Sequence, residues 1–191
     1  MKFNFQELFK ELIADLILRT ESNLKNAEIL NQKDFAALNQ KVNPESWSAL
    51  ECLQHLNLYG DFYLPEIEQR MAASKYPPQP IFKSSWLGNK FAEMLKPREK
   101  LNKIPAPKDK NPVGSTLDKS IITEFINQQH KMLSLLEQAK SVNLQKIKAS
   151  ITLSKFIKLR LGDVFRVVIY HNERHLEQAF KAVGKEILVS S

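Results

Sequence analysis

The sequence is dominated by four stretches of about twenty residues in which apolar side chains recur every three or four positions. In the first stretch this pattern runs from Phe5 to Ile17 and continues to Leu30. Such spacing puts the apolar side chains on one face of an α-helix, because the helix has about 3.6 residues per turn. Four helices that each bury one face predict an all-α fold, a four-helix bundle around a shared core.

Local signals set the ends of the second helix. Ser48 and Glu51 have the spacing of a capping box, in which each side chain bonds the other residue's backbone N–H. The helix is therefore expected to begin near Trp47, whose indole would pack at the helix entry. The pair Pro77-Pro78 forbids a helix beyond about Lys75, because proline lacks the N–H that a helix needs.

The third and fourth helices carry similar signals. Ser115, with Asp118 three residues later, is suited to open the third helix, whose apolar face runs from Ile121 to Ala139. Asp163 is the expected N-cap of the fourth helix, and Gly184 is placed to end it.

The second and third helices are separated by a long connection at about 76–114. Seven of the nine prolines lie in it, at positions 77, 78, 80, 97, 105, 107 and 112, and a short helix is expected at 86–95. Connections of this length are usually functional lids or linkers, so this one either covers a pocket or serves as a spacer. The 191 residues are expected to form a single domain, 1–191, from which this connection is a loop excursion.

Composition and charge indicate which compartment and which partners to expect. No apolar run approaches the ~18 residues of a membrane-spanning helix, and the N-terminal segment does not resemble a signal peptide. The single cysteine, Cys52, excludes an internal disulfide and suits a reducing compartment, so a cytoplasmic location is expected. The net charge of +7 is compatible with nucleic acid, but the lysine-rich segment 96–110 has no interleaved aromatic residues, which disfavours that partner.

Two of the four histidines, His171 and His175, stand four residues apart in the fourth helix. Residues at this spacing differ by about 40° in direction and ~6 Å in height, so both imidazoles can reach one cation. His55 lies on the bundle side of the second helix. Three converging imidazoles leave coordination positions open, as in catalytic metal sites. His130, at the margin of the third helix's apolar face, is interpreted as structural or exposed.

Four further side chains lie within one turn of these histidines. Gln178 either orients an imidazole or is a polar residue at the bundle rim, and Tyr59 either presents its hydroxyl to a cavity or packs in the core. Glu51, one turn before His55, is a further candidate to support the site, although the capping box with Ser48 explains it fully. Cys52 is either a soft ligand or reactive thiol, or a small buried apolar residue.

Two segments carry a resemblance to a known family: Trp47-Ser48-x-x-Glu51-x-x-x-His55-Leu56 and His171-x-x-x-His175-Leu176-x-Gln178. In their order and spacing they resemble the DinB/YfiT-like superfamily, and the similarity covers most of the chain. The resemblance implies a bundle with a long connection, a divalent metal held by three histidines, and often a homodimer. By motif position, the metal ligands would be His55, His171 and His175.

The resemblance specifies the site more firmly than the reaction. Family members include thiol-dependent S-transferases, maleylpyruvate isomerases and predicted metal-dependent hydrolases. The expected function is therefore that of a metal-dependent enzyme acting on a small molecule through activated water or a low-molecular-weight thiol. Nickel and zinc both suit imidazole ligands, and no individual catalytic residue is assigned. The alternative is a non-catalytic bundle, associated with stress, that binds a metal or ligand.

Overall fold

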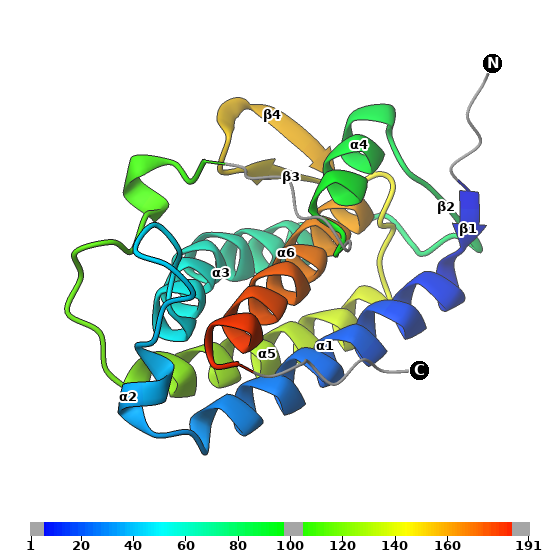
Figure 1. Cartoon of the computed structure of the whole chain (residues 1–191). Coiled ribbons are helices and arrows are strands. Elements are labelled where there is room, and N and C mark those ends of the chain that lie inside the picture. The colour runs from blue at the N-terminus through cyan, green and yellow to red at the C-terminus, as the bar shows by residue number, and fades with distance from the viewer. Residues whose placement is uncertain (1–5, 98–104, 185–191) are drawn as a thin grey trace.

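The computed structural model describes residues 6–97 and 105–184 (Figure 1). Phe5, and the part of the lysine-rich segment at 98–104, lie outside these residues. The described chain is mainly helical, as predicted. Its helices are α1 (Phe9–Asn31), α2 (Phe35–Leu38), α3 (Ala49–Ala72), α4 (Trp86–Leu95), α5 (Ser120–Ala139), α6 (Leu161–Ala182) and the short 3-10 helix η1 (Lys108–Lys110). Its strands are β1 (Gln6–Leu8), β2 (Ile81–Lys83), β3 (Lys148–Ile151) and β4 (Ser154–Arg160).

The four long helices pack on one another, and their buried apolar side chains form two clusters. Helices α1 and α3 each pack against both α5 and α6, and Figure 1 shows α6 running between α3 and α1. The largest fully buried side chains include Phe125 of α5 and Phe165 and Phe180 of α6. Burial of these apolar faces stabilises the helices more than their intrinsic propensities do.

The capping box predicted for the second helix is present at the start of α3. The Ser48 N–H donates to Glu51 Oε2 at 2.8 Å, and the Glu51 N–H donates to Ser48 Oγ at 3.2 Å. The predicted end of the fourth helix is also confirmed, because Gly184 follows α6 with a φ of 70°. Glycine has no Cβ and adopts this left-handed conformation without strain.

The predicted starts of the third and fourth helices are corrected. Helix α5 begins at Ser120, and Asp118 accepts a hydrogen bond from the Ser120 N–H at 2.7 Å. Helix α6 begins at Leu161, so Asp163 lies in its first turn and is not the N-cap. Its buried carboxylate instead accepts hydrogen bonds from Ser84 and Ser85, a tertiary interaction that local sequence does not reveal.

The all-α prediction omits two small antiparallel sheets. Strand β1 pairs with β2, and β3 pairs with β4 as a hairpin. Ala149 and Ile151 of β3 and Leu159 of β4 are buried and alternate with more exposed residues. This period of two is a strand signal. It extends over only a few residues, too few for the sequence alone to distinguish these strands from an irregular segment.

The long connection contains regular structure. The short helix predicted at 86–95 is present as α4, and β2 precedes it. The Asp163 carboxylate fastens the start of α4 to α6, where Ser85 Oγ donates to Asp163 Oδ2 at 2.9 Å and accepts from the Gly88 N–H at 3.0 Å. Helix α4 is therefore held over α6, with its apolar side packed against the buried side chains there.

Across residues 6–97 and 105–184, none of the helices combines the length and the apolar character needed to cross a lipid bilayer.

Candidate metal centre

Three imidazoles from two helices meet where α3 packs against α6. His55 comes from α3, and His171 and His175 come from adjacent turns of α6. One ring nitrogen from each lies within 4.8 Å of the other two, and His55 Nε2 is 3.2 Å from His171 Nε2. The ring centroids are 4.6–5.0 Å apart. The packing of α3 on α6 thus brings together the three histidines that the sequence suggested.

The spacing of the nitrogens is compatible with one shared ion. A tetrahedral zinc ion with Zn–N bonds of about 2.0–2.1 Å separates neighbouring ligand nitrogens by about 3.3 Å. The His55–His171 distance of 3.2 Å is close to this value. The third nitrogen, which completes a group no wider than 4.8 Å, needs a ring movement of at most about 1.5 Å. Such a movement is within the range of side-chain torsions.

Two of the imidazoles are oriented by hydrogen bonds from their outer nitrogens. His55 Nδ1 lies 2.6 Å from the backbone carbonyl of Lys110, the last residue of η1, and His175 Nδ1 lies 3.0 Å from Gln178 Oε1. A carbonyl oxygen only accepts, so Nδ1 of each ring carries the proton. The Nε2 lone pairs are then available for a metal, which is the usual arrangement of metal-binding histidines.

Burial keeps the three imidazoles neutral. Desolvation lowers the pKa of His55, and it lowers the pKa of His171 well below its ordinary value, with further lowering by His175 and His55. Desolvation, together with His55, lowers the pKa of His175 to about 3. The Arg174 guanidinium adds to the effect on both α6 histidines. Neutral imidazole is the form that binds metals.

Two aromatic side chains frame the imidazoles. The indole of Trp47 stacks on His175 with centroids 5.6 Å apart and also contacts His55 at 4.7 Å. The phenol of Tyr59 contacts His55 and His171 at 4.9 and 4.6 Å. Burial raises the pKa of Tyr59 to about 12, so its hydroxyl stays protonated and can donate a hydrogen bond.

A cavity of about 750 Å³ opens beside the imidazoles, which form part of its lining. One wall is apolar and comes from α4, the β3–β4 hairpin and the first turns of α6: Phe91, Met94, Leu95, Ile151, Leu153, Leu159, Val167 and Val168. The other side is polar and includes Asn43, Ser46, Asn111 and Gln178. Among the described lining residues, Arg174 is the only arginine or lysine. The cavity can therefore hold a small molecule with an apolar part.

The remaining residues considered from the sequence have other surroundings. Glu51 forms the capping box and an ion pair with Lys41 at 2.8 Å. Cys52 is fully buried, and burial raises the pKa of its thiol, so it is an apolar core residue. His130 is exposed on α5. Tyr59 and Gln178, in contrast, both line the cavity.

Sequence reasoning missed three contributors to the site. Trp47 was expected only to pack at a helix entry, and Arg174 was not singled out, although it immediately precedes His175. The carbonyl of Lys110 comes from the long connection, and its role depends on the backbone alone. A backbone carbonyl has no sequence signature, so only the fold could identify it.

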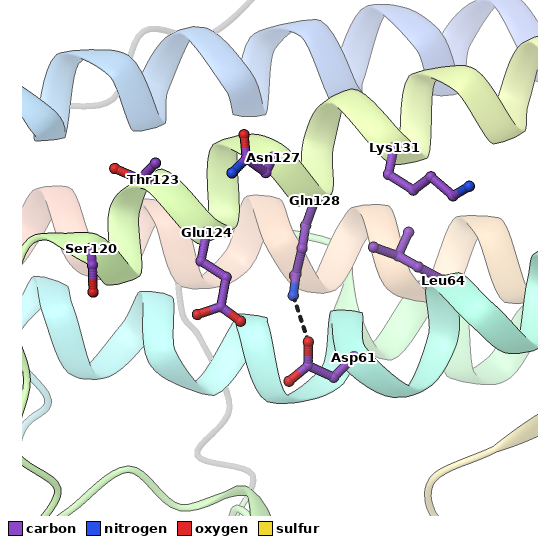
Figure 2. A pocket seen from close by; sticks show the side chains of 8 residues that line it. All are labelled: Asp61, Leu64, Ser120, Thr123, Glu124, Asn127, Gln128 and Lys131. Atoms are coloured by element: carbon purple, nitrogen blue, oxygen red, sulfur yellow. Dashed lines mark hydrogen bonds between the residues drawn. The ribbon is translucent and has the colours of Figure 1, made fainter.

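A second hollow, of about 580 Å³, lies between α3 and α5 (Figure 2). Gln128 donates a hydrogen bond to Asp61 at 3.0 Å across it. The pKa of the nearby Glu124 is raised by partial burial and by Asp61. The described residues that line this groove include no histidine or cysteine, so it lacks the donor set found beside α6.

Comparison with protein-family models matches residues 19–179 to the family described as the DinB superfamily. The matched region contains the three imidazoles and all four long helices except the first turns of α1 and the last residues of α6. Neither the curated proteins nor the solved structures yield a significant match.

Proposed function

The chain belongs to the DinB superfamily, and we propose that it is a metal-dependent enzyme that binds one divalent ion through His55, His171 and His175. We also propose that its four long helices form the four-helix bundle of the DinB/YfiT-like type. The observation that carries the proposal is the convergence of three neutral imidazole nitrogens within 4.8 Å at the edge of a cavity.

The donor set favours a transition metal. Imidazole suits zinc and nickel, whereas magnesium and calcium prefer oxygen ligands. Three protein ligands also leave a position for water or substrate, which distinguishes catalytic zinc sites from closed structural ones. When bound, such an ion lowers the pKa of a coordinated water or thiol and so supplies a nucleophile near neutral pH.

The protein's own groups prepare this site. The Lys110 carbonyl and Gln178 keep the His55 and His175 protons on Nδ1 and thereby direct both Nε2 atoms inward. The Arg174 guanidinium, close to both α6 imidazoles, adds positive charge that favours an anionic group on the substrate. The Tyr59 hydroxyl, which lines the cavity and stays protonated, is available to donate a hydrogen bond to that group.

The apolar wall restricts the substrate. Phe91 and Leu95 of α4, with Leu159 of the hairpin, exclude water from one side of the cavity. The substrate is accordingly a small molecule with an apolar body and a polar or anionic reacting end. The reaction is hydrolysis or transfer of a low-molecular-weight thiol. A bundle that binds metal or ligand without turnover remains the competing proposal, since the donor set alone serves both.

Metal analysis of the purified chain tests the first step. The wild-type protein is expected to bind one zinc or nickel ion per chain, and His55→Ala to lose it. His130→Ala is the matched control, because it removes an exposed imidazole outside the site. Absence of metal binding from wild-type protein at micromolar zinc and nickel, or equal binding by wild type and His55→Ala, contradicts the proposed site.

A second assay distinguishes an enzyme from a protein that binds metal without turnover. The metal-loaded protein is screened with ester substrates and with electrophiles plus a thiol, each with an apolar substituent. Turnover that His171→Ala abolishes supports the enzyme. Stoichiometric metal binding without turnover across these substrates favours the non-catalytic bundle.

A further inference from the structure

The β3–β4 hairpin has an outward face that is both cationic and apolar. Side chains alternate along the strands, so Ala149 and Leu159 face the bundle while Lys148, Lys158 and Arg160 lie on the opposite face. The hairpin and the two residues before it, 146–160, contain five lysines or arginines and no aspartate or glutamate.

The cross-strand register places like charges together. Lys148 is directly opposite Arg160, and Lys158 is opposite Ser150, in the next outward-facing position. Like charges directly opposite one another on a sheet destabilise it. Within the described part of the chain, none of these three cations is ion-paired with a carboxylate. The face therefore concentrates positive charge that the bundle does not neutralise, which is the complement of an anionic surface.

Large apolar side chains protrude beside these cations. Phe156 follows Lys158 toward the turn on the outward face of β4 and is 98% exposed. Leu153, in the turn of the hairpin, is 60% exposed. Single exposed apolar residues are common on protein surfaces. An almost fully exposed aromatic ring next to a lysine is a more specific arrangement. Figure 1 shows where the β3–β4 hairpin lies in the fold.

We propose that the outward face of the β3–β4 hairpin docks on an anionic lipid bilayer. Lys148 and Lys158, both exposed, would lie at the level of the lipid phosphates, and Phe156 and Leu153 would enter the apolar boundary beneath them. Arg160, whose guanidinium donates to the Lys83 carbonyl, adds positive charge beside them. Nucleic acid could also attract the cations. It offers base stacking to Phe156 but no apolar phase for Leu153, so the pair of protruding apolar side chains favours lipid.

The hairpin also forms part of the wall of the cavity. Leu153 also lines the cavity beside the imidazoles, so a docked hairpin brings the cavity to the membrane surface. A substrate with an apolar body could then enter directly from the bilayer. The docking itself does not depend on a metal, because none of the hairpin residues belongs to the imidazole group.

Vesicle sedimentation with the full-length chain tests the proposal. The protein is expected to bind vesicles of phosphatidylcholine with about 30% phosphatidylglycerol and to dissociate from them at high salt. It is expected not to bind vesicles of pure phosphatidylcholine. Each cation near such a surface contributes about fivefold in affinity, so Lys148→Gln/Lys158→Gln should bind roughly 25-fold more weakly. Phe156→Ser should weaken binding about tenfold.

Matched variants supply the controls. Lys25→Gln removes an exposed cation from α1, and Phe35→Ser removes a half-exposed aromatic from α2; both should bind as wild type. His171→Ala should also retain vesicle binding, so failure of the metal site and failure of docking are distinguishable. Equal binding to neutral and anionic vesicles, or unchanged binding by the hairpin variants, overturns the proposal. So does a single-stranded oligonucleotide that displaces the vesicles and whose binding the same variants abolish.

Discussion

Gln178 provides the sharpest test of how the site is built. Its side-chain oxygen lies 3.0 Å from His175 Nδ1, and the residue is only partly buried on α6. Gln178→Leu keeps the size of the side chain and removes the acceptor. The imidazole of His175 can then rotate or place its proton on Nε2, the atom that faces the other two histidines. The metal affinity should fall although all three ligands are still present.

The magnitude follows from the single interaction lost. Removing a group that orients a metal-binding histidine typically lowers metal affinity 10- to 100-fold, or about 1.4–2.7 kcal/mol. The free energy of unfolding of the metal-free protein should change by only about 1 kcal/mol, the net contribution of a typical hydrogen bond. Gln178→Glu retains an acceptor, and its negative charge strengthens the bond to Nδ1–H, so its metal affinity should equal or exceed that of wild type.

Zinc affinity is measured by calorimetric competition against a chelator at pH 7, with thermal unfolding of each metal-free variant in parallel. Gln138→Leu, a substitution on the exposed side of α5, is the control for the change of residue type. The reasoning is refuted if Gln178→Leu binds zinc as tightly as wild type while His175→Ala binds it weakly. His175 would then be a ligand whose orientation does not depend on Gln178.

Three further predictions concern stability. In metal-free protein the three imidazoles have pKa values below the ordinary 6.5, so the unfolded chain binds more protons than the folded one. The free energy of unfolding is therefore greatest above about pH 6.5 and falls with decreasing pH, by about 3 kcal/mol at pH 4 from His175 alone. Urea titrations across this pH range measure the change. A flat profile between pH 7 and 4 contradicts the burial of neutral imidazoles. Asp163→Ala removes the acceptor of the Ser85 N–H and hydroxyl and should cost about 3 kcal/mol in urea unfolding, whereas a loss under 1 kcal/mol argues against this anchor for α4. Gly162→Ala places a Cβ 2.6 Å from the buried Phe82 ring and should cost about 2 kcal/mol in thermal unfolding, and an unchanged melting temperature shows that the ring moves freely.

The helices were predictable because their signals are local. The apolar period fixed the approximate extents of α1, α3, α5 and α6, and the Ser48–Glu51 spacing marked the start of α3. The hairpin was not predicted, since its strands are short and Ala149 and Leu159 are buried against α3 and α6, which are distant in sequence. Asp163 was given the wrong role because an N-cap aspartate and one that bonds a distant serine look alike in sequence.

The candidate site was likewise predictable only in part. Helical periodicity alone puts His171 and His175 on one face, because both lie on one helix four residues apart. Whether His55, 116 residues before His171, meets them depends on how α3 packs against α6. The cavity, the stacking of Trp47 on His175 and the Lys110 carbonyl likewise arise from contacts between distant segments. The sequence thus determined which side chains could bind a metal. Only the tertiary structure decided that they share one centre, because the distance between side chains of different helices depends on how those helices pack.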